Sequence, residues 1–333
     1  MRRQFCRLAA ATTLALVVML SGSQSQAQAQ AQTQAQTWPD RSVKWILPFG
    51  AGSATDIAAR LLAERLSAKW GKPVVIENRP GGDGLVAINA FTAANDDHVL
   101  LYASSASFMA HPYTQEKLPY DLERDLTPIA RVCDTVVAAS VPAASEFKTV
   151  SEFVARAKAE PGKYHAAGAA GVPEFSLGAF LKSENLDVTK VPYRDVVQAG
   201  RDLGEQRIHF LLSSYAVVRP LVEANKVRVL GAGGRKRAAI TPNVPSVQET
   251  GYPTLVTETT SGLYGPKGMP LALRERIAAD VIAAANDPAA VEKIVASGQD
   301  MNTGGPAELA ATLKQQGEAL TRVAKILGME RKQ

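Results

Sequence analysis

The sequence predicts an α/β protein made of two α/β domains that are joined by two crossover segments. Short apolar runs typical of strands alternate along the chain with longer segments whose apolar residues recur at helical spacing. The first unit, residues 43–76, reads strand, small-residue loop, helix and strand, which implies a parallel pair with a right-handed crossover. The chain has 333 residues, of which 46% are hydrophobic and 21% charged, so it is long enough for two sheets and apolar enough to bury a core.

Each predicted element rests on its own local pattern. Residues 43–47 (VKWIL) are strand-like, whereas Leu62, Leu66 and Trp70 fall on one face of a helix that Gly71 ends. We predict strands over residues 43–47, 74–76, 99–102, 132–140, 164–167, 188–191, 208–212, 227–230 and near 255–264. We predict helices over residues 55–70, 85–94, 150–158, 176–183, 196–203, 271–286, 289–297 and 306–327.

The order of these elements suggests where the chain passes between domains. The strand near 136–141 is the predicted first crossing, and the run near 257–263 is the predicted return. The first lobe would then comprise residues 38–138 and 260–333, and the second lobe residues 139–259. We expect the three C-terminal helices to pack on the first lobe.

The N-terminus reads as a cleaved export signal. Arg2, Arg3 and Arg7 precede an apolar run at 8–20, which is too short to span a bilayer but typical of a signal core. Small-x-small cleavage sites at 27–31 predict a signal over 1–31 with a spacer to about 37. We favour the Sec route over the twin-arginine route, which the Arg2–Arg3 pair also permits. Removal of the signal lowers the net charge from +5 to +2, and we find no basic stripe for nucleic acid.

Residues 49–56 (FGAGSATD) form the most informative loop, because they follow a strand and open a helix. Exposed backbone N–H groups and the helix dipole make such a loop suitable for an anion. Glycines allow close approach, hydroxyls can donate, and Asp56 is placed to cap the helix. The alternative is a plain strand-to-helix turn, and the local pattern leaves both open. The candidate residues are Phe49, Gly50, Ala51, Gly52, Ser53, Thr55 and Asp56.

Two further loops repeat the position of the first, at the end of a strand. Ser104, Ser105 and Ser107 follow the strand at 99–102, at the edge where doubly wound sheets bind ligands. Residues 168–171 (GAAG) occupy the corresponding position in the second half and offer backbone donors only. The alternatives are a serine-rich solvent loop and a tight turn.

No enzyme or metal motif accompanies these loops. The histidines at 98, 111, 165 and 209 are scattered, and none forms a His-x-x-x-His pair or accompanies a ligand cluster. No Gly-x-Ser-x-Gly elbow, phosphate loop or dinucleotide fingerprint occurs. Cys133 is the one cysteine left after cleavage, so we expect no disulfide and a buried, inert thiol. We therefore predict no cofactor, no metal and no catalytic residue.

Seven short segments, in their order and spacing, resemble the periplasmic solute receptors of tripartite tricarboxylate transporters, the Bug receptors. They are 38–41 (WPDR), 47–56 (LPFGAGSATD), 75–84 (VIENRPGGDG), 118–121 (LPYD), 157–163 (AKAEPGK), 191–193 (VPY) and 242–251 (PNVPSVQETG). The resemblance covers residues 38–328 and implies a two-lobed, type II-like periplasmic binding protein without enzymatic activity. It further implies a small carboxylate ligand, membrane transporter subunits as partners, and a monomer.

The resemblance also implies a site. The family holds its carboxylate with backbone N–H groups, hydroxyls and waters, which maps onto 49–56 and 104–107. The second lobe would contribute Gly168, Ala169 and Ala170, with Tyr193 nearby. Ala169, Ala170, Asp195 and Ser213 depart from residues common in the family, so the distal pocket is remodelled and the ligand is left unnamed.

Two other functions remain open at this point. One is an exported enzyme acting on a carboxylate, with Asp195 or His165 as the acid–base group, and turnover of a bound acid would identify it. The other is a sensor receptor that docks on a signalling protein, and capture of the membrane partner would distinguish it from a transport receptor.

Overall fold

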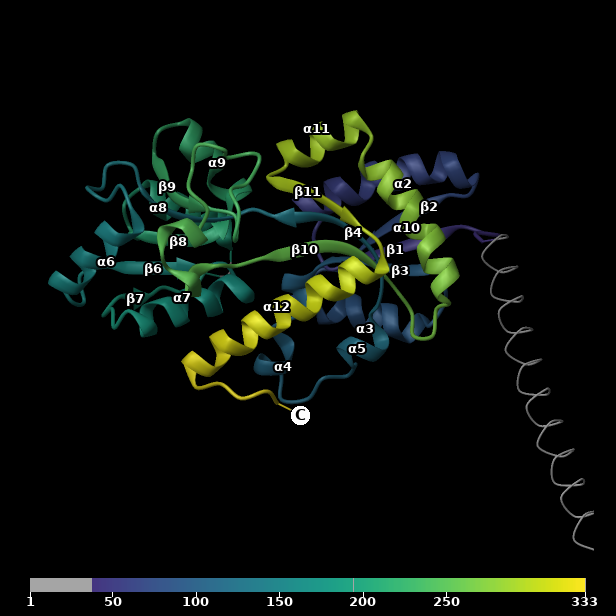
Figure 1. Ribbon diagram of the computed structural model, residues 1–333, viewed down its shortest axis with the longest axis horizontal. Coiled ribbons are helices and arrows are strands. Elements are labelled where there is room, and N and C mark those ends of the chain that lie inside the picture. Colours follow the sequence, from purple (N-terminus) through teal and green to yellow (C-terminus); the bar gives the residue numbers. More distant parts are fainter. Residues whose placement is uncertain (1–37, 194, 333) are drawn as a thin grey trace, which may run out of the picture.

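The computed structural model describes residues 38–193 and 195–332, so the predicted signal and spacer lie outside the described residues. Two mixed sheets form two lobes (Figure 1). The first sheet has six strands in the order β11-β4-β10-β3-β1-β2, and the second has five in the order β7-β6-β8-β5-β9. The predicted two-lobed α/β fold is confirmed.

The chain enters the first lobe, crosses to the second and returns. The first-lobe elements are β1 (Val43–Leu47), α2 (Ala54–Trp70), β2 (Val74–Asn78), α3 (Leu85–Ala94), β3 (Val99–Ser104), α4 (His111–Thr114), α5 (Leu122–Asp125) and β4 (Thr127–Thr135). The second-lobe elements are β5 (Val137–Pro142), α6 (Val150–Ala159), β6 (His165–Gly168), α7 (Val172–Ser183), β7 (Thr189–Lys190), α8 (Val196–Gly204), β8 (Phe210–Ser214), α9 (Tyr215–Glu223) and β9 (Val227–Ala232). The returning elements are β10 (Thr259–Gly265), α10 (Leu271–Ala285), α11 (Pro288–Ala296), β11 (Gln299–Gly304) and α12 (Pro306–Leu327).

The predicted strand at 132–140 is wrong as a single element. It comprises the end of β4 and the start of β5, which belong to different sheets, so the chain crosses between lobes at Val136. Val137 pairs with Ser214 in the second sheet, two residues before the predicted boundary. On the return, Thr259 already pairs with Thr135 in the first sheet. A continuous apolar run does not reveal where an extended chain leaves one sheet for another.

Among the α-helices and strands, the sequence pattern did not predict α4, α5, α9 and β11. α9 contains Pro220, which argues locally against a helix interior, yet its buried Tyr215 and Val218 pack into the core of the second lobe. β11 (QDMNTG) is polar and becomes a strand only because it pairs antiparallel with β4 at the sheet edge. Its register shift near Gly304 is consistent with an irregular edge strand.

The last helix packs on both lobes, which corrects the expectation that all C-terminal helices pack on the first lobe. α10 packs on β4 and α2, as expected, whereas α12 packs on both β4 and α7. Leu320 and Ala324 of α12 share an apolar cluster with Tyr113 of the first lobe and Phe175 of the second. In Figure 1 α12 runs across the front of the molecule towards α7. The two crossovers are therefore not the only connection between the lobes.

Candidate functional site

The loop between β1 and α2 is held in shape by the start of the helix. Ser53, in extended conformation, is the N-cap, and its Oγ accepts a hydrogen bond from the backbone N–H of Asp56 at 3.2 Å. The prediction that Asp56 caps α2 is therefore wrong, because Asp56 lies in the first turn and the residue that precedes the helix takes the cap. Gly50, Ala51 and Gly52 are exposed at the tip, and Phe49 is half-buried.

The Asp56 carboxylate holds this loop in place through hydrogen bonds. Its Oδ2 accepts from the Gly52 N–H at 2.9 Å and from Arg60 Nε at 3.0 Å, and its Oδ1 accepts from Asn78 Nδ2 at 2.8 Å. Burial would raise the pKa of the Asp56 carboxyl, but these hydrogen bonds outweigh it and leave the pKa below its usual value. The carboxylate and the Gly52 N–H thus bind each other.

Asn78 is a residue of this site that the sequence pattern did not single out. Its side-chain amide donates to both Phe49 O, at 2.9 Å, and Asp56 Oδ1, at 2.8 Å. It therefore joins the end of β2 to both ends of the loop. Its place at the end of the strand parallel to β1 was the available signal, since such strand ends share one sheet edge.

The serine loop lies beside the first loop because β1 and β3 are parallel neighbours, with Ile46 paired to Leu101. Ser104 Oγ accepts from the Ala106 N–H at 3.4 Å, and Ser105 Oγ accepts from the Thr260 N–H at 3.0 Å. Ser105 therefore ties the loop to the start of β10. Ser107 Oγ is buried, and it has no hydrogen-bond partner among the described residues.

The second-lobe loop and Ser213 lie together because Gly168 pairs with Leu212 in parallel strands. The Ala169 N–H donates to Leu212 O at 2.9 Å, and Ala169 O accepts from the Glu174 N–H at 3.0 Å. Ala170 is exposed, whereas Ser213 is fully buried. The backbone of Ala169 is thus engaged within its own lobe.

Tyr193 and Asp195 have structural contacts of their own. Tyr193 Oη donates to Asp202 Oδ2 at 2.8 Å, and burial together with Asp202 raises the pKa of Tyr193 to about 12. Asp195 is the N-cap of α8 and accepts from the Val197 N–H at 2.9 Å. Neither contact brings these two side chains to the loops of the first lobe.

The loops of the two lobes approach each other at Gly171. Gly171 has φ +84°, and a Cβ built on it would lie 3.2 Å from Ala106 O. The structure therefore brings 49–56 and 104–107 together within the first lobe, and 168–171 with Ser213 within the second. The serine loop at 104–107 and the second-lobe loop at 168–171 face each other across the lobes.

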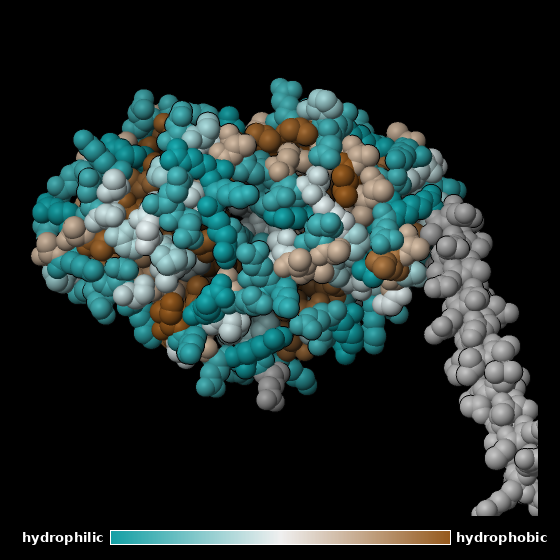
Figure 2. All heavy atoms as spheres, viewed as in Figure 1, coloured by the Kyte–Doolittle hydropathy of each residue, from teal (hydrophilic) through white to brown (hydrophobic). Residues whose placement is uncertain are grey.

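A separate groove of about 640 Å³ lies between α4, α5 and α12. Apolar residues such as Phe108, Leu126, Leu313 and Leu320 line it, and none of the predicted site residues does. Figure 2 shows that hydrophilic side chains cover most of the viewed face, with apolar groups gathered in patches. This groove is distinct from the contact between the loops.

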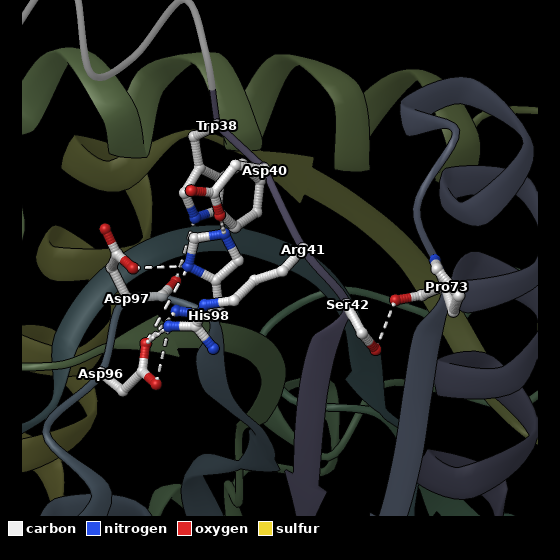
Figure 3. A network of polar contacts seen from close by, with 8 residues as sticks. All are labelled: Trp38, Asp40, Arg41, Ser42, Pro73, Asp96, Asp97 and His98. Carbon is white, nitrogen blue, oxygen red and sulfur yellow. Dashed lines mark hydrogen bonds and ion pairs between the residues drawn. The ribbon is translucent and has the colours of Figure 1, made fainter.

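One histidine does accompany metal-ligating side chains, which corrects an expectation from the sequence. Asp96, Asp97 and His98 place ligand atoms within 4.8 Å of one another (Figure 3). Arg41 Nη2 donates to both carboxylate oxygens of Asp96, at 2.7 and 2.9 Å. His98 Nε2 lies 3.0 Å from Asp40 Oδ1. These contacts fasten the segment at 38–41 to the first lobe.

The chain is similar to a family of transport receptors along most of its length. The family model TctC, the tripartite tricarboxylate transporter family receptor, matches residues 58–328. A UPF0065 protein of Bordetella bronchiseptica is 30% identical over 282 residues, 84% of each chain. The protein BugT of Bordetella pertussis is 28% identical over 70% of this chain and 72% of its own.

Solved structures agree in fold. A periplasmic transporter, 27% identical, has a TM-score of 0.73 and covers 86% of this chain and 97% of its own. An R. palustris protein solved with adipate, 24% identical, has a TM-score of 0.74 and covers 88% of this chain and 99% of its own. With the family match over residues 58–328, the conclusion is that the chain belongs to the tripartite tricarboxylate transporter receptor family.

Proposed function

We propose that the protein captures a small carboxylate between its lobes in the periplasm and delivers it to a tripartite tricarboxylate-type membrane transporter. The observation that carries this proposal is the exposed loop at 50–52 before α2, on the same sheet edge as the serine loop at 104–107 that approaches Gly171 of the second lobe. Membership of a receptor family supports a binding role over a catalytic one.

The chemistry of the first loop favours an anion. α2 has 17 residues, so its N-terminus carries a full helix dipole, and the exposed backbone at Gly50–Gly52 lies directly before it. The nearby Asp56 carboxylate accepts the Gly52 N–H at 2.9 Å and pairs with Arg60 at 3.0 Å, so the attraction for an anion rests on the backbone at Gly50 and Ala51 and on the helix dipole. The buried hydroxyl of Ser107 is a further donor at the same sheet edge.

The solved neighbours guide the choice of test ligands. One was solved with adipate, and another, MatC from Rhodopseudomonas palustris, was solved with malate. Each is 24% identical to this chain, so both bear on the fold and only suggest the ligand class. The first panel should contain dicarboxylates, tricarboxylates, aromatic acids and acidic amino acids.

A thermal-shift panel of these acids tests capture. At about 100 times its Kd, a cognate acid adds about 2.7 kcal/mol to the free energy of unfolding, so the melting temperature rises. Solution scattering should also give a smaller radius of gyration at saturation, as lobe closure requires. If no acid in any of these classes raises the melting temperature, carboxylate capture is wrong; unchanged scattering at saturation overturns closure alone.

Delivery and export need separate experiments. None of the helices within residues 38–193 and 195–332 combines the length and apolar composition needed to cross a membrane. Pull-down with the loaded receptor should recover the transporter subunits, whereas recovery of a signalling protein supports the sensor function.

Export is tested by N-terminal sequencing of periplasmic material, in which the mature chain should begin between about Gln28 and Thr37. Turnover of the bound acid would instead indicate an enzyme.

A further inference from the structure

Three consecutive residues, Gly298–Asp300, connect the first loop to the second lobe. We name them the coupling segment. They end the α11–β11 connection and begin β11, at the sheet edge next to the first crossover, since Gln299 pairs with Thr135 and Asp300 with Asp134. The chain leaves the first sheet one residue after Thr135. The segment thus lies where the lobes must move relative to each other.

Gln299 contacts the start of the helix that carries the first loop. Its side chain is buried, with 1% exposed, and Nε2 donates to Ala54 O at 2.9 Å. Its Oε1 accepts from Cys133 Sγ at 3.1 Å, which fixes the orientation of the amide. Ala54 is the first residue of α2, directly after the N-cap Ser53. Gln299 therefore holds the loop against the edge of the first sheet.

Asp300 contacts the other lobe. Both carboxylate oxygens accept from the backbone N–H of Ala239, at 3.1 and 3.2 Å. Ala239 follows β9 and lies beside Ala238, which is part of the second-lobe core. Asp300 is half-buried, and this partial burial together with the neighbouring Asp134 raises the pKa of its carboxyl.

Two further contacts bring the second lobe onto the same place. A Cβ built on Gly298 would lie 2.8 Å from Cβ of Ala216, at the start of α9, so only glycine permits this approach. Arg219 of α9 donates to Ala296 O at 2.7 Å, just before the coupling segment. Backbone and side chain of one short stretch therefore contact both lobes.

We propose that the coupling segment links the conformation of the first loop to the closure of the lobes, with Gln299 as a positioning residue and Asp300 as the inter-lobe contact. A change in the loop shifts Ala54, and the hydrogen bond from Gln299 to Ala54 then shifts β11. The hydrogen bonds between Asp300 and the Ala239 N–H carry this shift to the second lobe. The proposal rests on the proposed function, because the coupling serves a receptor that closes on a ligand.

Amide hydrogen exchange of the ligand-free protein tests the coupling without any ligand. In the wild type the Ala239 amide should be protected. Asp300→Ala should speed its exchange about tenfold, the size expected when a hydrogen bond to a charged acceptor is lost. Asp300→Asn keeps an acceptor oxygen and should restore most of the protection. An unprotected Ala239 amide in the wild type overturns the inter-lobe contact.

Gln299→Leu is the decisive variant, because the hydrogen bonds of the Gln299 side chain go to Ala54, Cys133 and Ser297 and not to Ala239. It should speed exchange of the amides at 52–56 and also that of Ala239. Thr303→Ala is the matched control on the same strand, since its hydroxyl contacts only Asn286 in the described residues, and it should change neither. Faster exchange at 52–56 with Ala239 unchanged overturns the coupling. The exchange of core amides in α6 reports global unfolding. If these amides also exchange faster in Gln299→Leu, the experiment is repeated with Gln299→Met.

These outcomes are separable from those of the ligand panel. Coupled exchange in a protein that binds no acid would leave the coupling intact and remove the proposed function. Acid binding with uncoupled exchange would do the reverse.

Discussion

Gly52 is required by its backbone conformation rather than by crowding. Its φ is +83°, and a Cβ built on it would meet no atom within 4 Å. The open space on that side is the space that an approaching anion would use. A side chain at this position therefore brings conformational strain and obstructs the loop tip.

We expect Gly52→Val to abolish the acid-induced rise in melting temperature and to lower stability by about 1–2 kcal/mol through left-handed strain. Gly52→Ala carries the same type of strain with less obstruction, so it should bind more strongly than the valine variant. Calorimetric titration with melting curves measures both effects. A folded valine variant with wild-type affinity would place the anion site elsewhere.

Asp56→Asn tests the internal role of the buried carboxylate. The amide retains one acceptor oxygen but loses the charge that Arg60 and the Gly52 N–H contact, so we expect a loss of about 2 kcal/mol at pH 7. Because the folded pKa lies below the usual 3.8, this contribution is present above that pH and is lost as the pH falls through the lowered value.

Urea unfolding at pH 7 and near pH 3 measures this difference. The difference in the free energy of unfolding between wild type and Asp56→Asn should be smaller near pH 3 than at pH 7. Asp121→Asn is a suitable control, because Asp121 caps the exposed helix α5 and asparagine caps as well as aspartate. An equal gap at both values of pH would show that charge is not what Asp56 contributes.

At the scale of elements, adjacent strands β6 and β8 place two histidines together at the edge opposite the ligand loops. The rings of His165 and His209 stack with centroids 5.6 Å apart, and the backbone N–H of His165 donates to His209 Nδ1 at 3.1 Å. Burial, His165 and Lys163 lower the pKa of His209. The unfolded chain therefore binds a proton more readily than the folded one.

This arrangement predicts a stability that falls in mild acid. The loss should begin as the pH drops below the ordinary histidine value of about 6.5 and continue through the lowered pKa of His209. His209→Gln should flatten the dependence between pH 7.5 and 5.5, although buried His111, whose pKa burial also lowers, leaves a remainder. Denaturant melts across this range provide the measurement, and an unchanged slope would contradict the role of His209.

At the scale of the whole molecule, the contact between α12 and α7 should stabilise one arrangement of the lobes. Phe175→Ala removes an aromatic side chain that is 8% exposed from the cluster shared by both helices, at a cost of about 3 kcal/mol. We also expect a larger radius of gyration in solution scattering, because the lobes lose a contact outside the crossovers.

Phe91→Ala is the matched control for this prediction. Phe91 is also buried, with 1% exposed, but it packs within the first lobe alone, so its loss should lower stability without changing the radius of gyration. If both variants leave the radius unchanged, the α12 contact does not influence how the lobes are arranged.

Local patterns in the sequence were sufficient wherever an element buries one face of its own. The β1–loop–α2 unit and α12, predicted over 306–327, have the predicted bounds or differ by one residue. The same patterns, with the family resemblance, pointed to the two-lobed fold and to the first-lobe loops as neighbours, since parallel strands end at one sheet edge.

Contacts between distant segments were decided only by the tertiary structure. The polar β11 is a strand because it pairs with β4 at the edge of the first sheet. The apolar run at 132–140 is divided because its first part pairs in the first sheet and its last part in the second. Asp56 and Asn78 hold the loop, and Gln299 reaches Ala54 across 245 residues. Periodicity along the chain determines which face of an element is buried. Which partner meets that face depends on how the whole chain packs.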